Sequence, residues 1–372
     1  MKMQKNSINW HFIRSHIFVF DATLAILVFL IMSIGIMTLY SAGMDFPGRV
    51  EGQIRNIMVS LFIMWVMANI PPQTLMRFAI PIYTFGVALL IAVAVFGLVK
   101  KGSRRWLHVG IDMQPSEMMK IATPLMLAWY FQKREGALRW RDFVIGAVIL
   151  GIPAALIVKQ PDLGTAMLVT AAGFTVVFLA GLSWKFLISL ITAAAIIIPT
   201  VVWPYMLHDY QRDRVLTMLD PNRDPLGKGF HIIQSTIAVG SGGLHGKGYM
   251  KGTQAHLEFI PEHTTDFIFA VFSEEFGFVG NVVLVTLYFL LILRCLVIAA
   301  NAPTLFSRLM AGAVTMIFFT YAFVNMGMVI GIVPVVGVPL PFMSYGGTAL
   351  VTLGMGLGIM MSVQRNRKLV QT

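Results

Sequence analysis

The sequence predicts an all-α fold: a polytopic membrane helical bundle of about ten transmembrane helices, formed as one integral membrane domain over residues 1–372. Two observations carry this prediction. Of the 372 residues, 57% are apolar and only 12% are charged, and the mean hydropathy is +0.77, whereas soluble proteins carry about 25% charged residues. In addition, apolar blocks recur along the whole chain, each long enough to cross about 30 Å of hydrocarbon.

The blocks predict ten spans in chain order: 18–40, 54–70, 78–99, 115–131, 143–158, 163–182, 186–207, 279–298, 309–332 and 345–363. The first is too long for the core of a signal peptide and lacks a small-residue cleavage site, so we expect it to remain as a helix. Gly277 and Gly280 interrupt the apolar stretch from Phe267, which predicts a separate short helix over 267–276 before the eighth span. Residues 208–278 therefore form a large extracytoplasmic loop with a short helix between helices 7 and 8.

Basic residues orient the bundle. An even number of spans puts both termini on one side, and with the termini inside, the inner segments carry fourteen Lys and Arg residues against seven in the short outer loops. Since short cytoplasmic loops are enriched in Lys and Arg, we expect residues 1–17 and the tail 364–372 to be cytoplasmic.

The net charge of +11 does not by itself indicate a nucleic-acid partner. No basic run with interleaved aromatic residues is present, so a nucleic-acid partner is not expected. The single cysteine, Cys295, cannot form an internal disulfide, and the histidines show no spacing typical of metal ligands. The sequence thus predicts no metal site and requires no cofactor, although a divalent cation is compatible with it. The glycine-rich segment 240–248 lacks the spacing of a phosphate-binding loop, and flexible turns are the favoured interpretation.

The predicted topology sorts the polar clusters onto the outer face. They are Arg104–Trp106 with Gln114–Lys120, Lys159–Asp162, His208–Arg214, Pro261–Asp266, and Pro341–Thr348. A carboxylate and several cations at a membrane surface suit the attack of a sugar hydroxyl on an anomeric carbon that carries a lipid pyrophosphate. That leaving group needs no protonation, so one general base and cations for the pyrophosphate are sufficient.

Asp266 is the strongest candidate for the base, because it follows polar residues at a loop-to-helix junction; the alternative is a helix N-cap. Glu117 and Lys120 lie three residues apart on one helix face, so they either serve the reaction or form a simple ion pair. Asp162 follows Pro161 at the start of a span, where a plain cap is an equal alternative.

The remaining candidates also have two interpretations. Arg104, Arg105, Arg212 and Arg214 could bind phosphate or contact anionic lipid, and pairing of the loop arginines with Asp209 and Asp213 is a further alternative. Ser344 to Gly347 open a helix with consecutive backbone donors, which form either an anion-binding nest or a close helix contact through glycine.

At these residues the chain resembles the SEDS family (shape, elongation, division, sporulation) over nearly its whole length. The resemblance rests on several segments: His208–Gln211, Asp220–Pro221, Asp224–Gly227, Ile233–Ser235, Gly240–Gly243, Glu258–Phe267, Val336–Pro341 and Ser344–Gly347. The amino-acid sequence of the long loop resembles the elongation branch of the family more than its division branch.

The resemblance implies a peptidoglycan glycosyltransferase of the bacterial plasma (inner) membrane. It would polymerise lipid II into β-1,4-linked glycan strands, with inversion at the anomeric carbon and release of undecaprenyl pyrophosphate, for cell elongation and rod shape. The family's essential aspartate falls on Asp266, and its polar cavity falls on Arg105, Gln114, Glu117, Lys120 and Asp162. A class B penicillin-binding transpeptidase and other elongation-complex proteins are the implied partners.

Together, the residues and the resemblance assign catalysis to Asp266 and substrate binding to Arg105, Gln114, Glu117, Lys120, Asp162, Arg212, Arg214 and Ser344. Two functions from other classes stay open at this stage. One is a transporter that flips lipid II, although transporter sites tend to lie near the midplane of the bilayer. The other is a scaffold that recruits the transpeptidase without catalysis of its own.

Overall fold

The computed structural model describes residues 20–44, 46–100, 103–108, 112–206, 209–223, 228–253 and 262–370. The expected cytoplasmic segment 1–17 lies outside the described residues. The same holds for His208, at the start of the predicted long loop, and for residues 254–261 within it.

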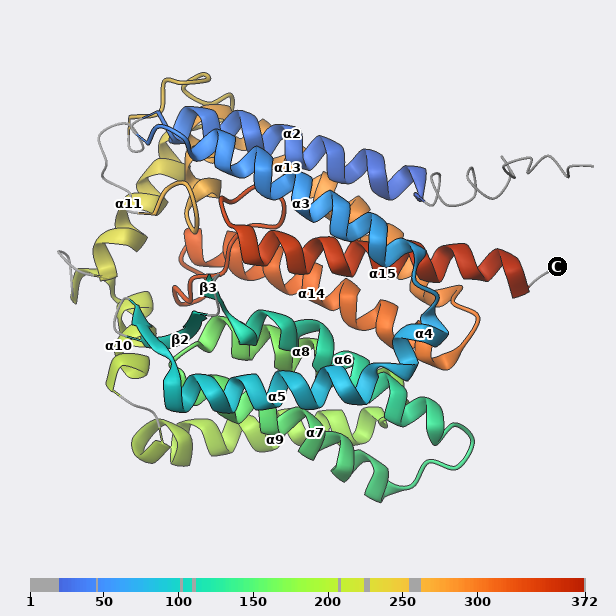
Figure 1. The fold of residues 1–372 in the computed structure, drawn as a ribbon. Coiled ribbons are helices and arrows are strands. Elements are labelled where there is room, and N and C mark those ends of the chain that lie inside the picture. The colour runs from blue at the N-terminus through green and yellow to red at the C-terminus, as the bar shows by residue number, and fades with distance from the viewer. Residues whose placement is uncertain are drawn as a thin grey trace, which may run out of the picture.

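Within the described residues the chain forms a bundle of long helices with one small antiparallel sheet (Figure 1). The helices before the sheet are α2 (Ala22–Ala42), α3 (Arg49–Asn69), α4 (Pro72–Arg77) and α5 (Ala79–Phe96). The strands are β1 (Leu98–Lys100), β2 (Ser103–His108) and β3 (Asp112–Met113), paired in the order β1-β2-β3. The helices after the sheet are α6 (Pro115–Lys133), α7 (Trp140–Lys159), α8 (Leu163–Leu179), α9 (Trp184–Ile197) with the π-helix η1 (Ile198–Met206), α10 (Asp209–Leu219), the 3₁₀ turn η2 (Pro221–Arg223), α11 (Lys228–Ser241), α13 (Ile268–Ala300), α14 (Leu305–Val329) and α15 (Gly347–Val370).

Each of the ten predicted spans corresponds to one of these helices, which confirms the all-α class; the short strands were not predicted. Seven helices of the described chain are long and apolar enough to cross a membrane: α2, α5, α7, α9 with η1, α13, α14 and α15. Helix α8 is shorter, and α3 and α6 are more polar because they carry several charged and amide side chains. The number of ten membrane crossings therefore stays a prediction.

The two ends of the bundle differ. Strands β2 and β3 and helices α10 and α11 gather at one end, whereas α4 and the C-terminal end of α15 lie at the other (Figure 1). Helix α14 runs through the centre: 78% of the residues in its most apolar stretch are buried. In α9 with η1, at the periphery, none of the corresponding residues is buried. The polar segments that the topology assigns to one face are thus close together in space.

Proline and carboxylate residues begin the helices that meet at this end. Pro115 occupies the first turn of α6, where its missing N–H costs no hydrogen bond. Asp162 caps α8, since its Oδ1 accepts a hydrogen bond from the backbone N–H of Thr165 at 3.1 Å. These caps fix where α6 and α8 start and therefore the depth of the side chains in their first turns.

Glycine brings α15 against α3. A Cβ atom at Gly354 would lie 2.4 Å from Ser60 Oγ, and one at Gly358 would lie 2.5 Å from the Met64 carbonyl oxygen. Only glycine permits this approach, as in other close helix pairs within membranes. The close contact holds the N-terminal end of α15 at the polar end of the bundle.

Helix α13 is broken at Gly277, whose φ of 65° is in the left-handed region. The predicted short helix over 267–276 is thereby confirmed. The segment 240–248 packs against the break: Lys247 N and Gly248 N donate to the carbonyls of Glu274 and Glu275, and Phe278 N donates to the Gly243 carbonyl at 2.8 Å. The predicted glycine turns are present at residues 242–245, and this segment also supplies the hydrogen bonds that the broken helix lacks.

Candidate functional site

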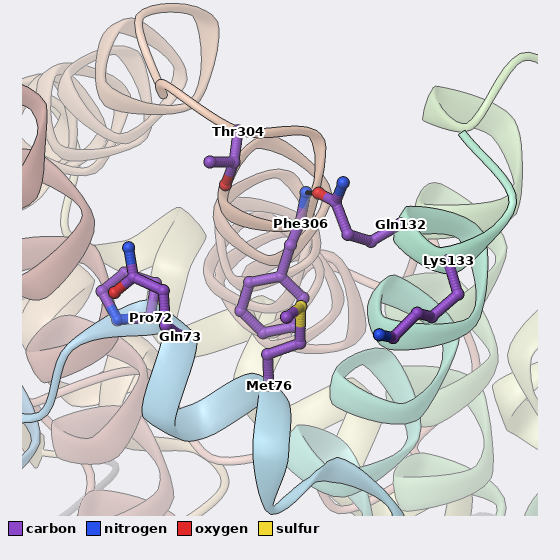
Figure 2. Close-up of a pocket in the computed structure, with 7 residues that line it drawn as sticks. All are labelled: Pro72, Gln73, Met76, Gln132, Lys133, Thr304 and Phe306. Atoms are coloured by element: carbon purple, nitrogen blue, oxygen red, sulfur yellow. Dashed lines mark hydrogen bonds between the residues drawn. The ribbon is translucent and has the colours of Figure 1, made fainter. Parts of the chain in front are cut away.

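Two cavities at opposite ends of the bundle can be compared. The cavity at the end near α4 has a volume of about 310 Å³ and contains none of the predicted site residues (Figure 2). Its lining is Pro72, Gln73, Met76, Gln132, Lys133, Thr304 and Phe306, with a single charged side chain. Gln132 Oε1 accepts a hydrogen bond from Phe306 N at 2.7 Å, so the Gln132 amide oxygen in this cavity is already bonded within the protein.

The cavity at the polar end is smaller, about 200 Å³, but gathers most of the predicted residues. Its lining is Arg105, Trp106, Gln114, Glu117, Lys120, Asp162, Thr165, Leu168, Thr265, Asp266, Gly337, Val338, Pro339, Tyr345, Gly346, Thr348 and Ala349. We call this the central cavity. It brings the predicted base together with all five residues of the predicted polar pocket, which come from β2, α6, α8 and the segment before α6.

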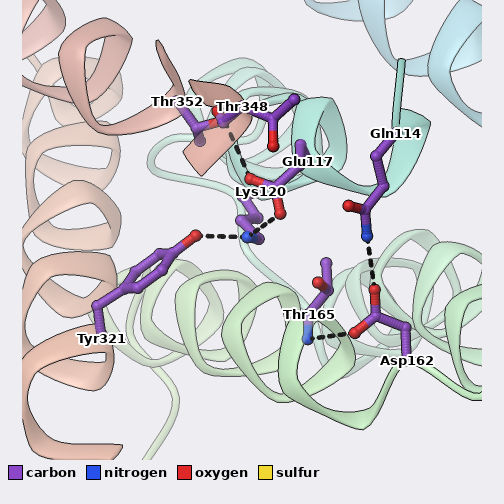
Figure 3. A network of polar contacts seen from close by, with 8 residues as sticks. All are labelled: Gln114, Glu117, Lys120, Asp162, Thr165, Tyr321, Thr348 and Thr352. Atoms are coloured by element: carbon purple, nitrogen blue, oxygen red, sulfur yellow. Dashed lines mark hydrogen bonds and ion pairs between the residues drawn. The ribbon is translucent and has the colours of Figure 1, made fainter. Parts of the chain in front are cut away.

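Lys120 is the most buried charge of the central cavity, with 2% of its side chain exposed. Its Nζ lies 2.5 Å from Glu117 Oε1 and also donates to the Tyr321 hydroxyl, while Thr352 Oγ1 donates to Glu117 Oε2 at 3.4 Å (Figure 3). The ion pair expected from the i, i+3 spacing is thus present, and both its members line the cavity. A buried charge needs such partners, since water cannot solvate it there.

Asp162 fulfils both of the roles that the sequence leaves open. One carboxylate oxygen caps α8 through Thr165 N, and the other accepts from Gln114 Nε2 at 2.8 Å (Figure 3). Gln114 immediately precedes α6. The contact therefore ties the starts of α6 and α8 to each other across the wall of the cavity.

Arg105 lies on β2 and contacts main-chain oxygens. Its Nε donates to the Gln160 carbonyl at 3.2 Å and its Nη2 donates to the Pro161 carbonyl. Within the part of the chain that the structure describes, Arg105 has no ion pair with a carboxylate. Neutral carbonyls hold the guanidinium in place without cancelling its charge, which leaves it suited to an anion in the cavity.

The structure places Phe267, not Asp266, at the N-cap position of α13, so Asp266 lies one residue before the predicted cap position. Asp266 Oδ2 lies 3.3 Å from the place that a Cβ on Gly337 would occupy, and Gly337 has a φ of 74°. Both residues line the central cavity, and a side chain at position 337 would crowd the carboxylate.

The backbone around Asp266 is anchored from two elements. Asn325 Nδ2, buried in α14, donates to the Asp266 carbonyl at 2.8 Å and to the Val338 carbonyl at 2.7 Å. Ser344 Oγ donates to the Thr265 carbonyl at 2.6 Å, and Tyr345 N donates to the Thr264 carbonyl at 2.9 Å. These bonds hold the aspartate against the segment that precedes α15.

Ser344 is predicted to bind substrate, but the structure places it behind the cavity wall. Its side chain is buried, donates to Thr265 and accepts from Leu340 N at 2.7 Å. The anion nest is also incompatible with the structure at residues 344–346, because their N–H groups donate to Leu340, Thr264 and the Gln53 side chain. The first turn of α15, with Thr348 and Ala349 on the cavity wall, still directs its positive helix end toward the cavity.

The two loop arginines separate. Arg214 lines a neighbouring cavity of about 220 Å³, which we call the side cavity and which also contains Asp266. Arg212 lies outside both cavities; its Nη2 donates to the Pro204 carbonyl at 2.9 Å and its Nη1 lies 3.8 Å from Asp209 Oδ1. The predicted pairing of loop charges is therefore present for Arg212, whose contact with substrate stays a prediction.

Sequence reasoning missed three residues of the site: Tyr321, Asn325 and Gly337. Tyr321 and Asn325 lie one turn apart on α14, and a polar side chain inside an apolar span is a signal that could have found Asn325. Gly337 could be suspected only from its place between valines. Among the described residues no group of three or more His, Cys, Asp or Glu side chains could hold a metal ion.

The chain was compared with known proteins. A family model described as cell cycle protein, covering FtsW, RodA and SpoVE, matches residues 16–369. Peptidoglycan glycosyltransferase MrdB of Escherichia coli K12 is 48% identical over 351 residues, covering 94% of this chain and 95% of that protein. Peptidoglycan glycosyltransferase RodA of Treponema pallidum is 30% identical over 420 residues, covering 92% and 97%.

Solved structures agree with these relatives. A chain from a peptidoglycan synthase complex, described as coordinating polymerization and crosslinking, superposes with a TM-score of 0.82 at 36% identity, covering 94% of this chain and 98% of that one. The rod shape determining protein RodA of Thermus thermophilus has a TM-score of 0.71 at 30% identity, covering 94% and 97%. The chain therefore belongs to the SEDS family, the family of FtsW, RodA and SpoVE.

Proposed function

We propose that this chain is a peptidoglycan glycosyltransferase that polymerises lipid II into β-1,4-linked glycan strands and releases undecaprenyl pyrophosphate. The observation that carries the proposal is the central cavity, where Asp266 shares one enclosed space with Arg105 and Lys120. The names of the relatives support the same activity. The cavity lies at the end of the bundle that the charge count assigns to the outer face of the plasma membrane, where lipid-linked sugars are polymerised.

Asp266 acts as the general base. The 4-hydroxyl of the acceptor N-acetylglucosamine gives its proton to the Asp266 carboxylate while its oxygen attacks the anomeric carbon of the donor N-acetylmuramic acid. The bond from that carbon to the pyrophosphate oxygen breaks, and the electron pair stays on the pyrophosphate. Attack from the face opposite the leaving group inverts the anomeric centre and yields the β linkage.

The leaving pyrophosphate is stabilised by Arg105, by Lys120 and by the N-terminal end of α15. Because Glu117 neutralises part of the Lys120 charge at 2.5 Å, Arg105 makes the stronger direct contact and Lys120 supplies a fixed positive potential. Preorganised charges of this kind act where negative charge develops during the reaction. Gln114 and Asp162 hold the walls of the cavity. The proposed reaction requires no cofactor, and a divalent cation beside the pyrophosphate is compatible with it.

The proposal extends to location and partner. The seven apolar helices make the chain a multi-span membrane protein, and we place it in the bacterial inner membrane with both termini cytoplasmic. A relative in a synthase complex that couples polymerization to crosslinking supports a class B penicillin-binding transpeptidase as partner, within a larger elongation complex. Inversion of the transmembrane topology would put the central cavity on the wrong side for this partner.

The test uses the purified full chain in lipid vesicles with labelled lipid II. Asp266→Asn should lower the rate of glycan formation by roughly 10²–10⁴-fold, the usual contribution of a general base. Asp213→Asn, the same substitution at an exposed residue of α10, serves as the matched control and should polymerise normally. Substantial polymer from Asp266→Asn would reject the base assignment.

The same assay separates the two rival functions. A flippase would move labelled lipid II between leaflets without making polymer, and the charges of the central cavity lie toward one end of the bundle, unlike the midplane sites of transporters. A scaffold would do neither. Polymer formed by the wild-type chain alone, and lost in Asp266→Asn, supports the glycosyltransferase over both.

A further inference from the structure

Asp266 lies between two cavities and is the one residue that lines both. The side cavity is lined by Arg214, Thr217, His231, Ile232, Glu262, Asp266, Phe267 and Val335. It is formed by α10 and α11 together with the segment that leads into α13. A residue in the wall between two cavities can meet a different substrate from each.

The two cavities differ in their chemistry. The central cavity holds two cations: Lys120 is paired with Glu117, whereas Arg105 is held by main-chain carbonyls and keeps its charge. The side cavity combines an apolar wall of Ile232, Phe267 and Val335 with five polar residues. Arg214 is the one cation among the residues that line the side cavity, and it stands against two carboxylates, Glu262 and Asp266. This lining has no surplus of positive charge for a pyrophosphate, whereas its carboxylates, hydroxyl and imidazole can form hydrogen bonds with a neutral sugar.

Thr217 and His231 are the two uncharged hydrogen-bonding residues of the side cavity, and His231 is the one held by a ring contact. Its ring stacks on Phe267 with centroids 6.0 Å apart and an interplanar angle of 18°, which fixes the orientation of the imidazole. Burial lowers the pKa of His231, with the Glu262 carboxylate opposing the shift. The imidazole is therefore neutral at pH 7.

The tautomer of His231 follows from its surroundings. Nδ1 is enclosed and has no hydrogen-bond partner within the described part of the chain. A buried donor without an acceptor is costly, so Nδ1 is the nitrogen without a proton and Nε2 carries the N–H. An imidazole N–H at the cavity wall suits an oxygen acceptor such as a hydroxyl or an acetamido carbonyl.

The chemistry of the reaction assigns the two cavities. In the donor, the reacting anomeric carbon is bonded directly to pyrophosphate, so cations must lie beside it. In the acceptor, the reacting hydroxyl is on the sugar farther from the pyrophosphate, so the subsite next to the base needs neutral hydrogen bonds and an apolar wall. The central cavity, with two cations and the positive end of α15, fits the first requirement. The side cavity, with hydrogen-bonding groups beside an apolar wall, fits the second.

We propose that the side cavity binds the N-acetylglucosamine ring of the acceptor, with His231 Nε2–H donating to an oxygen of that sugar, while the central cavity binds the donor. This assignment rests on the proposed glycosyltransferase function and adds to it which substrate enters on which side of Asp266. His231 is then a determinant of acceptor binding and takes no part in pyrophosphate departure.

The test gives each substrate a single role. The donor probe is lipid II whose 4-hydroxyl is capped with galactose, so that it cannot accept; the acceptor probe is the disaccharide-peptide with a methyl group in place of pyrophosphate, so that it cannot donate. One probe is varied while the other is saturating, and the coupled product is measured by mass spectrometry with the full chain in vesicles.

His231→Ala and His231→Phe should raise the KM for the acceptor probe by about tenfold, as expected for one lost hydrogen bond, and should leave the KM for the donor probe unchanged. His231→Phe keeps the ring stacked on Phe267, so it separates hydrogen bonding from packing. His231→Gln retains an N–H donor and should recover most of the affinity. Thr236→Ala, at an exposed residue of α11 whose hydroxyl bonds only within its helix, is the control.

A rise in the donor KM for the His231 variants, or no change in either KM, would overturn the assignment of the cavities. Failure of the wild-type chain to make glycan from ordinary lipid II would overturn the proposed function itself. The two failures are therefore distinguishable, because the second appears without any variant.

Discussion

The two sides of Asp266 are built from different kinds of chain. On the central-cavity side, Glu117 and Lys120 belong to the start of α6 and Asp162 caps α8, and each has a polar partner: Lys120 pairs with Glu117 at 2.5 Å and Gln114 donates to Asp162 at 2.8 Å. On the side-cavity side, the polar groups come from α10, α11 and the segment after residues 254–261. The helical side must satisfy every charge internally because hydrocarbon offers no hydrogen bonds, whereas the loop side lies outside the apolar spans.

This difference predicts unequal costs of mutation, and the largest cost is at Lys120. In Lys120→Ala, Glu117 stays in the same site without its cation, and breaking a buried pair in this way costs about 3–5 kcal/mol. Thermal or denaturant unfolding of the detergent-solubilised protein should show this loss. The double variant Glu117→Gln, Lys120→Met should recover most of the stability but not the polymerase activity.

Lys133→Ala provides the control, because it removes an exposed lysine from the other end of the same helix and should change stability by less than about 0.5 kcal/mol. Equal stability of the Lys120 and Lys133 variants would mean that the Lys120–Glu117 pair does not stabilise the central-cavity side of the bundle. Normal turnover of Lys120→Ala at saturating donor would further argue against its role beside the pyrophosphate.

The same difference explains which parts of the site were predictable from sequence. The topology puts six residues of the site at the ends of spans on one face, so counting helices predicts that they lie on the same side: Arg105, Gln114, Glu117, Lys120, Asp162 and Asp266. That they share a cavity was implied by the resemblance to the SEDS family. The break of α13 was signalled by Gly277, and the start of α6 by Pro115. These are local signals, since each acts on the backbone of its own segment.

The parts that were missed depend on contacts between distant segments. The N–H of Gly346 is taken by Gln53 from α3, which no local pattern reveals. Arg212 and Arg214 are two residues apart and so face different directions on α10, but the rotation of that helix decides which one meets the cavity. Asn325 was overlooked because an amide in an apolar span has no defined role until its partner, the Asp266 carbonyl, is known.

Asn325 links the helical side to the base, and its loss should have the second-largest effect. Asn325→Ala removes both hydrogen bonds, to the Asp266 and Val338 carbonyls, so the carboxylate is no longer held in one position. We expect kcat to fall by roughly 10–100-fold, because a small misplacement of a catalytic group is that costly, with little change in the KM for lipid II.

The matched control for this positioning residue is Asn301→Ala, whose exposed side chain bonds only to Val297 in its own helix. It should keep wild-type kcat and KM. A purely structural role for Asn325 would instead lower the amount of folded protein and leave kcat per folded molecule unchanged.

The smallest expected effect lies on the loop side and concerns the stability of the fold at mildly acidic pH. The pKa of His231 is lowered in the folded chain. On lowering the pH, the unfolded chain therefore binds a proton near pH 6.5 that the folded chain does not bind. The contribution of His231 to stability is complete above about pH 6.5 and is lost as the pH falls through the lowered pKa. His231→Gln cannot titrate and should remove this part of the pH dependence. The neighbouring groups Arg214, Glu262 and Asp266 are present in both proteins, so the difference between their melting temperatures from pH 7.5 to 5.5 isolates the histidine. If the two curves stay parallel over this range, the folded chain does not hold His231 in the neutral form.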